Sequence, residues 1–306
     1  MDDVVVQALG RLMPGVRRGE VSRDERRLRW VEAGSGSPTV VLDAAAGEPG
    51  SLAWAGVMPM VAARTRVVAY DRAGLGVSDP VWPLDVRTQA EDLTAVIRAT
   101  GSGPSVLAGH SWGGLLAQLV ALQHPELIAG LVLVDPADEE FLATSREGLQ
   151  QGLALGQAVL EQHASGELAT TVVDTFRPFV QQLTRDQQAQ ALLLNAYLAC
   201  YSTQSQARMV LGEHRLVSAS LLTIREARQQ RTLPDVPVVI FSATTGTPKD
   251  ERSAWTGFHA DLAASVPSGE HVVLTDTSHA MNQERPAEIA AGIERVLDQH
   301  AASQFS

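Results

Sequence analysis

The stretch that decides the fold is PSVLAGHSWGGLLAQLVALQHP, residues 104–125. A short apolar run leads into the pentapeptide GHSWG at 109–113, and an apolar helical pattern follows directly. A serine in such a strand-to-helix turn has a strained backbone, and a side chain at either flanking glycine position would clash. Its hydroxyl stands exposed above the sheet, and the next amide points toward a developing oxyanion. The pattern therefore predicts Ser111 as a nucleophile.

Short runs rich in Val and Leu recur along the chain, separated by helical patterns and bounded by Gly, Pro or polar residues. They span residues 39–42, 66–70, 105–108, 131–134, 236–241 and 271–274. This alternation is typical of βαβ units on a parallel sheet. Helical periodicity appears over 87–100, where Gly101 ends it, and over 186–201. The chain is therefore predicted to be an α/β protein.

Strand patterns disappear between residues 136 and 232, where helical patterns rich in Gln and Ala take over. We expect a core domain made of residues 1–135 and 233–306, with a helical insertion at 136–232. An insertion at the carboxyl edge of the sheet would roof the place where open α/β sheets bind ligands. We interpret the insertion as a cap, or lid, and the alternative is a second helical domain with its own core.

Composition excludes several kinds of chemistry. Among 24 basic residues there is one lysine, Lys249, and it lies outside any glycine-rich turn, which argues against a P-loop and lysine nucleophiles. The single cysteine, Cys200, can form neither an intramolecular disulfide nor a thiolate metal cluster. A formal charge of −11 offers no attraction to nucleic acid or anionic lipid. We expect no metal and no cofactor.

The N-terminal segment MDDVVVQALG carries acids where a secretory signal carries bases. No uncharged apolar run approaches the ~18 residues of a membrane-spanning helix. These features predict a cytoplasmic protein that does not enter a membrane.

The segment GHSWGG resembles the nucleophile elbow of the α/β-hydrolase fold superfamily. VVLDAAAGEPGSLAW (40–54) looks like the strand and oxyanion loop of that superfamily. VVAYDRAGLGVSDP (67–80) is similar to the D-x-x-G-x-G-x-S-x-P loop of hydrolases and prolyl aminopeptidases, and 124–136 and 271–286 match later strands and the histidine loop. The resemblance implies a mostly parallel, eight-stranded sheet flanked by helices, with a helical cap after the sixth strand and a triad in the order Ser, acid, His.

A serine needs a base to take its proton, and eight histidines are available. His279 is predicted as that base, since TSHAMNQERP lies just after the last strand and resembles the histidine loop of the superfamily. His110 is expected to pack or form hydrogen bonds structurally. His271 flanks the last strand, and we expect it to be structural or catalytic and not a zinc ligand.

The acid of the triad has two candidates. The usual position follows the strand at 236–241, where the first aspartate is Asp250, flanked by charged residues typical of a solvated turn. The alternative is Asp135 at the tip of LVLVDP, where some branches of the superfamily carry their acid. A carboxylate there would order His279 through Nδ1. We predict Asp135 and keep Asp250 as the alternative.

The oxyanion hole is predicted to use the amides of Trp112 and Ala46. The superfamily often has His-Gly where this chain has Ala44-Ala45, which leaves the loop geometry open. The indole of Trp112 either forms a wall of the pocket or packs against neighbours at the helix start.

A serine at the elbow predicts acyl transfer, and the leading hypothesis is cleavage of a carboxylic ester or lactone. Epoxide hydrolysis or dehalogenation would require an aspartate there. A prolyl-type aminopeptidase or amidase, a thioesterase and a C–C hydrolase are neighbouring hypotheses, and a ligand-binding protein without catalysis is a more distant one. The expected partner is a small-molecule ester or lactone, and a homodimer stays open.

Overall fold

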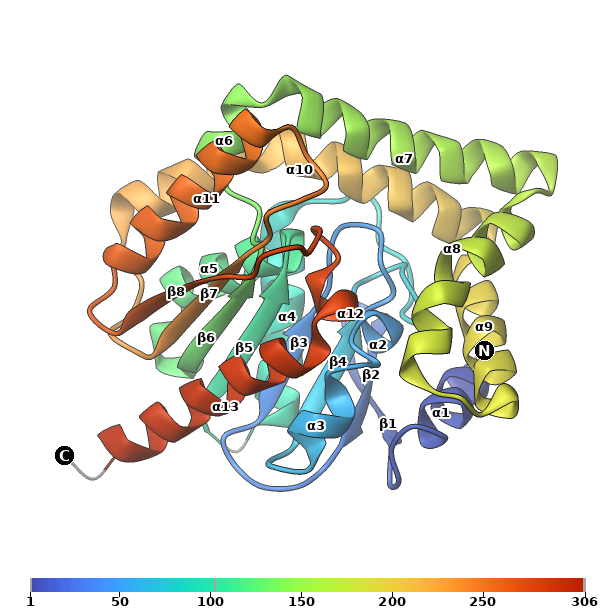
Figure 1. The fold of residues 1–306 in the computed structure, drawn as a ribbon, viewed down its shortest axis with the longest axis horizontal. Coiled ribbons are helices and arrows are strands. Elements are labelled where there is room, and N and C mark those ends of the chain that lie inside the picture. The colour runs from blue at the N-terminus through green and yellow to red at the C-terminus, as the bar shows by residue number, and fades with distance from the viewer. Residues whose placement is uncertain (1, 102, 305–306) are drawn as a thin grey trace.

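Eight strands form one sheet in the computed structural model, which describes residues 2–101 and 103–304 (Figure 1). The strand order is β1-β2-β4-β3-β5-β6-β7-β8, with β1 and β2 antiparallel to their neighbours and the other strands parallel. The strands are β1 (Arg17–Arg23), β2 (Arg26–Ala33), β3 (Val40–Asp43), β4 (Val67–Asp71), β5 (Ser105–His110), β6 (Ile128–Val134), β7 (Val238–Ser242) and β8 (Gly269–Val273). The predicted fold class is confirmed.

Helices cover both faces of the sheet because successive side chains of a strand point to opposite faces. In β5, Val106 and Ala108 belong to one apolar core, and Leu107 belongs to the other. The helices outside the insertion are α1 (Asp2–Gly10), α2 (Gly50–Ala53), α3 (Met58–Ala62), α4 (Val86–Thr100), α5 (Trp112–Gln123), α11 (Lys249–Ala264), α12 (Met281–Glu284) and α13 (Pro286–Ser303), and a short 3₁₀ turn spans η1 (Pro125–Leu127). Parallel strands buried on both faces explain the continuous apolar runs in the sequence.

The first two strands were not located in the sequence. Each of them contains three arginines, and a search for apolar runs does not detect such segments. Arg26 is nevertheless buried, because its guanidinium lies 2.5 Å from the buried Asp92 carboxylate. Because paired charged residues can be buried, a strand that contains them lacks the apolar run by which strands are recognised in a sequence.

Between β6 and β7 the described chain forms five helices and no strand, and the sequence predicted helices without strands in this stretch. They are α6 (Glu139–Thr144), α7 (Arg146–Ser165), α8 (Leu168–Leu183), α9 (Gln187–Tyr201) and α10 (Gln204–Gln230). Figure 1 shows α7 and α10 side by side across one end of the sheet, and these two helices are in extensive contact. The division into a core domain and a cap domain remains a prediction.

Among the described residues, none of the helices combines the length and apolar character needed to cross a bilayer.

Candidate active site

Ser111 occupies a strained turn between β5 and α5. Its φ of 52° and ψ of −115° lie outside the regions that L-residues normally adopt. The turn is closely packed: a Cβ on Gly109 would lie 2.4 Å from the Gly113 carbonyl oxygen, and a Cβ on Gly113 would lie 2.6 Å from the Ala44 carbonyl oxygen. The glycines of the motif are therefore required by backbone contacts with the end of β3 and the start of α5.

Asp135 and His279 form a close pair, although they are far apart in the sequence. His279 Nδ1 lies 2.6 Å from Asp135 Oδ2. Asp135 directly follows β6, next to β5, and it has a positive φ of 41°. Its side chain is fully buried. The structure thus brings together the acid and the base that the sequence selected for the triad.

Asp135 is held in its charged form by its surroundings. Arg252 Nη1 lies 3.0 and 2.8 Å from the two carboxylate oxygens, and the Ala243 amide donates to Oδ1 at 3.0 Å. Burial alone would raise the pKa of Asp135, but the hydrogen bond from His279 and the charges of His279 and Arg252 hold it well below the ordinary value. The role of Arg252 could not be predicted from the sequence, because nothing in KDERSAW (249–255) distinguishes a buried arginine from a solvated one.

The second candidate for the acid lies elsewhere. Asp250 is exposed in the first turn of α11, where a carboxylate is favourable near a helix N-terminus. The structure does not bring it to His279, whose Nδ1 faces Asp135.

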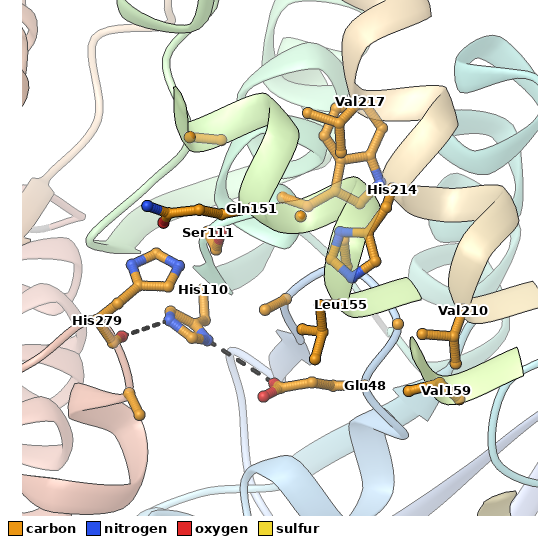
Figure 2. A pocket seen from close by; sticks show the side chains of 18 of the residues that line it. Glu48, His110, Ser111, Gln151, Leu155, Val159, Val210, His214, Val217 and His279 are labelled. Atoms are coloured by element: carbon orange, nitrogen blue, oxygen red, sulfur yellow. Dashed lines mark hydrogen bonds and ion pairs between the residues drawn. The ribbon is translucent and has the colours of Figure 1, made fainter. Parts of the chain in front are cut away.

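A pocket of about 790 Å³ lies between the sheet edge and the helices of the insertion. Ser111, His279, Ala46 and Trp112 all line it, so the structure brings the predicted nucleophile, base and oxyanion-hole residues to one cavity. Figure 2 shows the Ser111 and His279 side chains facing the same space. The remainder of the lining is mostly apolar and includes Phe141, Leu149, Leu155, Val159, Phe176, Val210 and Val217.

The aromatic residues of the insertion divide between two roles. Phe176 and Tyr201 line the pocket. Tyr197 is fully buried where the insertion packs on the rest of the protein: its hydroxyl donates to the Leu52 carbonyl oxygen at 3.1 Å, and its ring stacks on Phe176 with centroids 3.9 Å apart. The indole of Trp112 is buried in the core and donates from Nε1 to Gln89 Oε1 at 2.8 Å. This hydrogen bond favours the packed role for Trp112.

The loop after β4 explains the D-x-x-G-x-G-x-S pattern. The Asp71 carboxylate accepts hydrogen bonds from the Ser51 amide and hydroxyl and from the Val77 amide. Gly76 has a φ of +51°, and a Cβ there would lie 2.2 Å from the Asp71 carboxyl carbon. Burial raises the pKa of Asp71 to about 6. These hydrogen bonds hold the loop in place at Asp71 and so fix the backbone position of the following residue, Arg72.

Arg72 joins the predicted oxyanion loop to the insertion. Its guanidinium donates to the Ala44 and Ala45 carbonyl oxygens at 2.7 and 2.6 Å and contacts the Asp43 carboxylate at 2.5 Å. It also donates to both oxygens of Glu213, a fully buried residue of α10, at 2.7 and 2.8 Å.

Glu213 in turn accepts from backbone and side-chain donors of the core. The Gly47 amide donates to Oε2 at 2.7 Å, and Gln89 Nε2 donates to Oε1 at 2.7 Å. Because Gln89 also accepts from Trp112, one network connects both predicted oxyanion-hole segments to α10. Sequence reasoning missed it because its members come from five separate segments.

We expect Glu213→Gln to lower the free energy of unfolding by about 3 kcal/mol, since it removes one carboxylate from a buried ion pair with Arg72. Urea denaturation followed by circular dichroism measures the change. Glu226→Gln, an exposed position on the same helix, is the control and should change stability by less than about 0.5 kcal/mol. Equal stability of both variants would show that the buried pair does not stabilise the loop.

Two further histidines have structural partners. His271 Nε2 lies 2.8 Å from the Ser242 hydroxyl, which also lies 2.7 Å from His259 Nδ1. His259 Nε2 lies 2.8 Å from the Pro136 carbonyl oxygen. This series of hydrogen bonds connects α11 and β8 to β7, so the contacts of His271 favour a structural role for it. His110 also forms a structural hydrogen bond, as expected, with Nε2 2.7 Å from the His279 carbonyl oxygen.

Residues 34–292 match the model of the alpha/beta hydrolase family, and the chain belongs to this family. A soluble epoxide hydrolase from Corynebacterium sp. is 36% identical over 111 residues, which cover 36% of this chain and 38% of that protein. A putative carbamate hydrolase RutD from Pantoea ananatis is 26% identical over 253 residues, covering 81% of this chain and 84% of that protein. In four curated relatives, the epoxide hydrolase included, the stretch that matches this chain spans only 7 to 38% of the relative's own length.

A solved structure of a putative epoxide hydrolase mutant from Pseudomonas aeruginosa has a similar fold, with a TM-score of 0.72 and 19% identity. The similarity covers 94% of this chain and 98% of that one. At this level of identity the structural similarity supports the assignment of the fold alone.

Proposed function

We propose that the protein is a serine hydrolase that cleaves a carboxylic ester or lactone through an acyl-enzyme on Ser111. The observation that carries the proposal is the strained serine in the same pocket as His279, which is paired with the buried carboxylate of Asp135. A serine nucleophile at this position attacks a carbonyl carbon. The tetrahedral adduct then expels the leaving group and restores the carbonyl, which leaves an acyl group on the serine. Family membership supports hydrolysis as the reaction type.

In the proposed reaction, His279 Nε2 accepts the Ser111 proton while Oγ attacks the carbonyl carbon. The amides of Trp112 and Ala46 stabilise the oxyanion, and the bond to the alcohol breaks as His279 returns the proton to it. Water then attacks the acyl-enzyme with His279 as the base, which releases the carboxylic acid and restores Ser111. Asp135 orients the imidazole through Nδ1 and stabilises the imidazolium.

Serine at the elbow disfavours the epoxide chemistry named for some relatives, since an epoxide needs a carboxylate nucleophile there. A carbamate, named for another relative, presents a carbonyl and stays compatible with the site. Amides, thioesters and C–C bonds beside a carbonyl also present a carbon that a serine can attack. The helices between β6 and β7 act, in this proposal, as a cap that encloses an apolar substrate.

Labelling by a fluorophosphonate and release of nitrophenol from short acyl esters test the proposed function. We expect stoichiometric labelling of the purified protein at Ser111, identified by peptide mass spectrometry, and none in Ser111→Ala. Turnover of at least one ester should accompany it. Absence of both labelling and turnover in folded protein would refute the serine-hydrolase proposal.

The rate should depend on pH through His279. Burial lowers the pKa of His279 below its ordinary value, although the hydrogen bond to Asp135 opposes this shift. Because the neutral ring is the base, activity should persist as the pH falls and reach half its plateau below about pH 6.5. A profile of kcat/KM against pH measures this, with circular dichroism at each pH to exclude unfolding. Half-maximal activity well above pH 7 would contradict the direction of the shift.

A further inference from the structure

A second group of polar atoms lines the pocket beside the proposed triad. Glu48 Oε2, His110 Nδ1 and His214 Nε2 are buried and have no hydrogen-bond partner within residues 2–101 and 103–304. They come from the loop after β3, the end of β5 and helix α10. Figure 2 shows Glu48 pointing toward His110, with His214 reaching the pocket from α10. Buried polar groups are usually hydrogen-bonded, so we expect a bound molecule to supply the hydrogen bonds that these three atoms lack.

His110 has only one nitrogen committed to the protein. Its Nε2 lies 2.7 Å from the His279 carbonyl oxygen, and a carbonyl accepts hydrogen bonds, so Nε2 carries the hydrogen. In the neutral ring Nδ1 is then an acceptor, and it faces Glu48 Oε2 across 3.9 Å. That distance exceeds a hydrogen bond, and in the neutral ring neither atom has a hydrogen to donate to the other, so the two groups attract only as an ion pair when the ring is protonated. A donor placed at these two atoms would satisfy both.

His214 reaches the same region from the insertion. Its ring is seated against α7, where a Cβ on Gly152 would lie 3.0 Å from Nδ1 and one on Gly156 would lie 3.2 Å from Cδ2. Its Nε2 faces the loop that carries Glu48, since a Cβ on Gly47 would lie 3.5 Å from it. Burial lowers the pKa of His214, which favours the neutral ring, and in the tautomer that carries its hydrogen on Nδ1 the Nε2 atom is an acceptor.

We propose that Glu48, His110 and His214 form a subsite that binds a hydrogen-bond-donating group of the substrate, either a hydroxyl or a protonated amino group. The inference rests on the proposed function and names its substrate class: a hydroxy- or amino-substituted ester or lactone with an otherwise apolar body. The donor group lies close to the scissile carbonyl, because the rings of His110 and His279 are 4.7 Å apart between centroids. The apolar lining elsewhere in the pocket holds the remainder of the substrate.

Three phenyl esters that differ at one carbon test the subsite. They carry a hydroxyl, an ammonium or a methyl group on the second or, in a second set, the third carbon of the acyl chain. We expect kcat/KM for the hydroxyl or the ammonium ester to exceed that for the methyl ester by about 10- to 100-fold in one set, as one hydrogen bond to a charged group permits. Which of the two is preferred identifies the donor. Equal kcat/KM for all three in both sets would overturn the proposal.

Variants locate the preference in the protein. Glu48→Gln should reduce the ratio of donor to methyl ester, because it removes the charge and its amide offers a donor from the protein side. His214→Phe should also reduce the ratio. Glu251→Gln removes another carboxylate of the pocket lining and should leave the ratio unchanged. A ratio that survives both of the first two changes would overturn the assignment to these residues.

Binding to Ser111→Ala separates this inference from the proposed function. Calorimetric titration with the same esters should show tighter binding of the donor ester by about 10- to 100-fold. If the unaltered protein neither cleaves an ester nor becomes labelled, the proposed function fails, and this titration still decides the subsite. Equal affinities for the three esters would refute the subsite even if ester cleavage is observed.

Discussion

Ser111→Ala is expected to reduce kcat for the best ester by about 10⁶-fold while the fold is retained. The change removes one oxygen atom, and alanine keeps the Cβ that makes the φ of 52° strained for serine, so the variant adds no new steric clash at this position. Without Oγ no acyl-enzyme forms, and the residual rate comes from binding and the oxyanion hole. Steady-state turnover together with circular dichroism measures both parts of the expectation.

The control for this change is Ser205→Ala, an exposed serine on α10 that should keep the full rate. A second measurement uses pre-steady-state release of nitrophenol, where the burst that reports acyl-enzyme formation should vanish in Ser111→Ala. Retention of more than about one hundredth of the activity would mean that another group performs the attack.

Asp135→Asn is expected to reduce kcat by about 10⁴-fold. The carboxylate oxygen that now accepts from His279 Nδ1 at 2.6 Å would belong to a neutral amide, which neither fixes the tautomer nor stabilises the imidazolium. Asparagine tolerates the positive φ of 41°, so backbone strain does not account for the loss. Arg252 would lose its buried counter-charge, and a lower melting temperature should accompany the lost activity.

Asp250→Asn is the matched control, because it makes the same chemical change at the second candidate for the acid and should preserve turnover within about twofold. The double variant Ser111→Ala/Asp135→Asn adds a further test: if the residues act as a unit, it should be no slower than Ser111→Ala alone. Loss of turnover in Asp250→Asn with activity retained in Asp135→Asn would reverse the assignment.

Local pattern was sufficient for the elements that hold the site. Six of the eight strands, and the helices over 87–100 and 186–201, begin and end within about three residues of their predicted places. Their apolar periodicity reflects burial on one or both faces, which neighbouring residues report directly. The arginine-rich β1 and β2 were missed because the charge pairs that bury Arg26 involve a distant helix.

The sequence by itself determined the nucleophile elbow, since glycine spacing, the apolar strand and the helix that follows are all local features. It also determined the fold class and selected His279 by its place after the last strand. Only the tertiary structure decided that Asp135 and not Asp250 meets His279, because that contact joins residues 144 positions apart. It alone revealed the Arg72–Glu213 network and the cluster of Glu48, His110 and His214. Buried polar groups are defined by the partners that folding brings to them, and those partners are scattered along the chain.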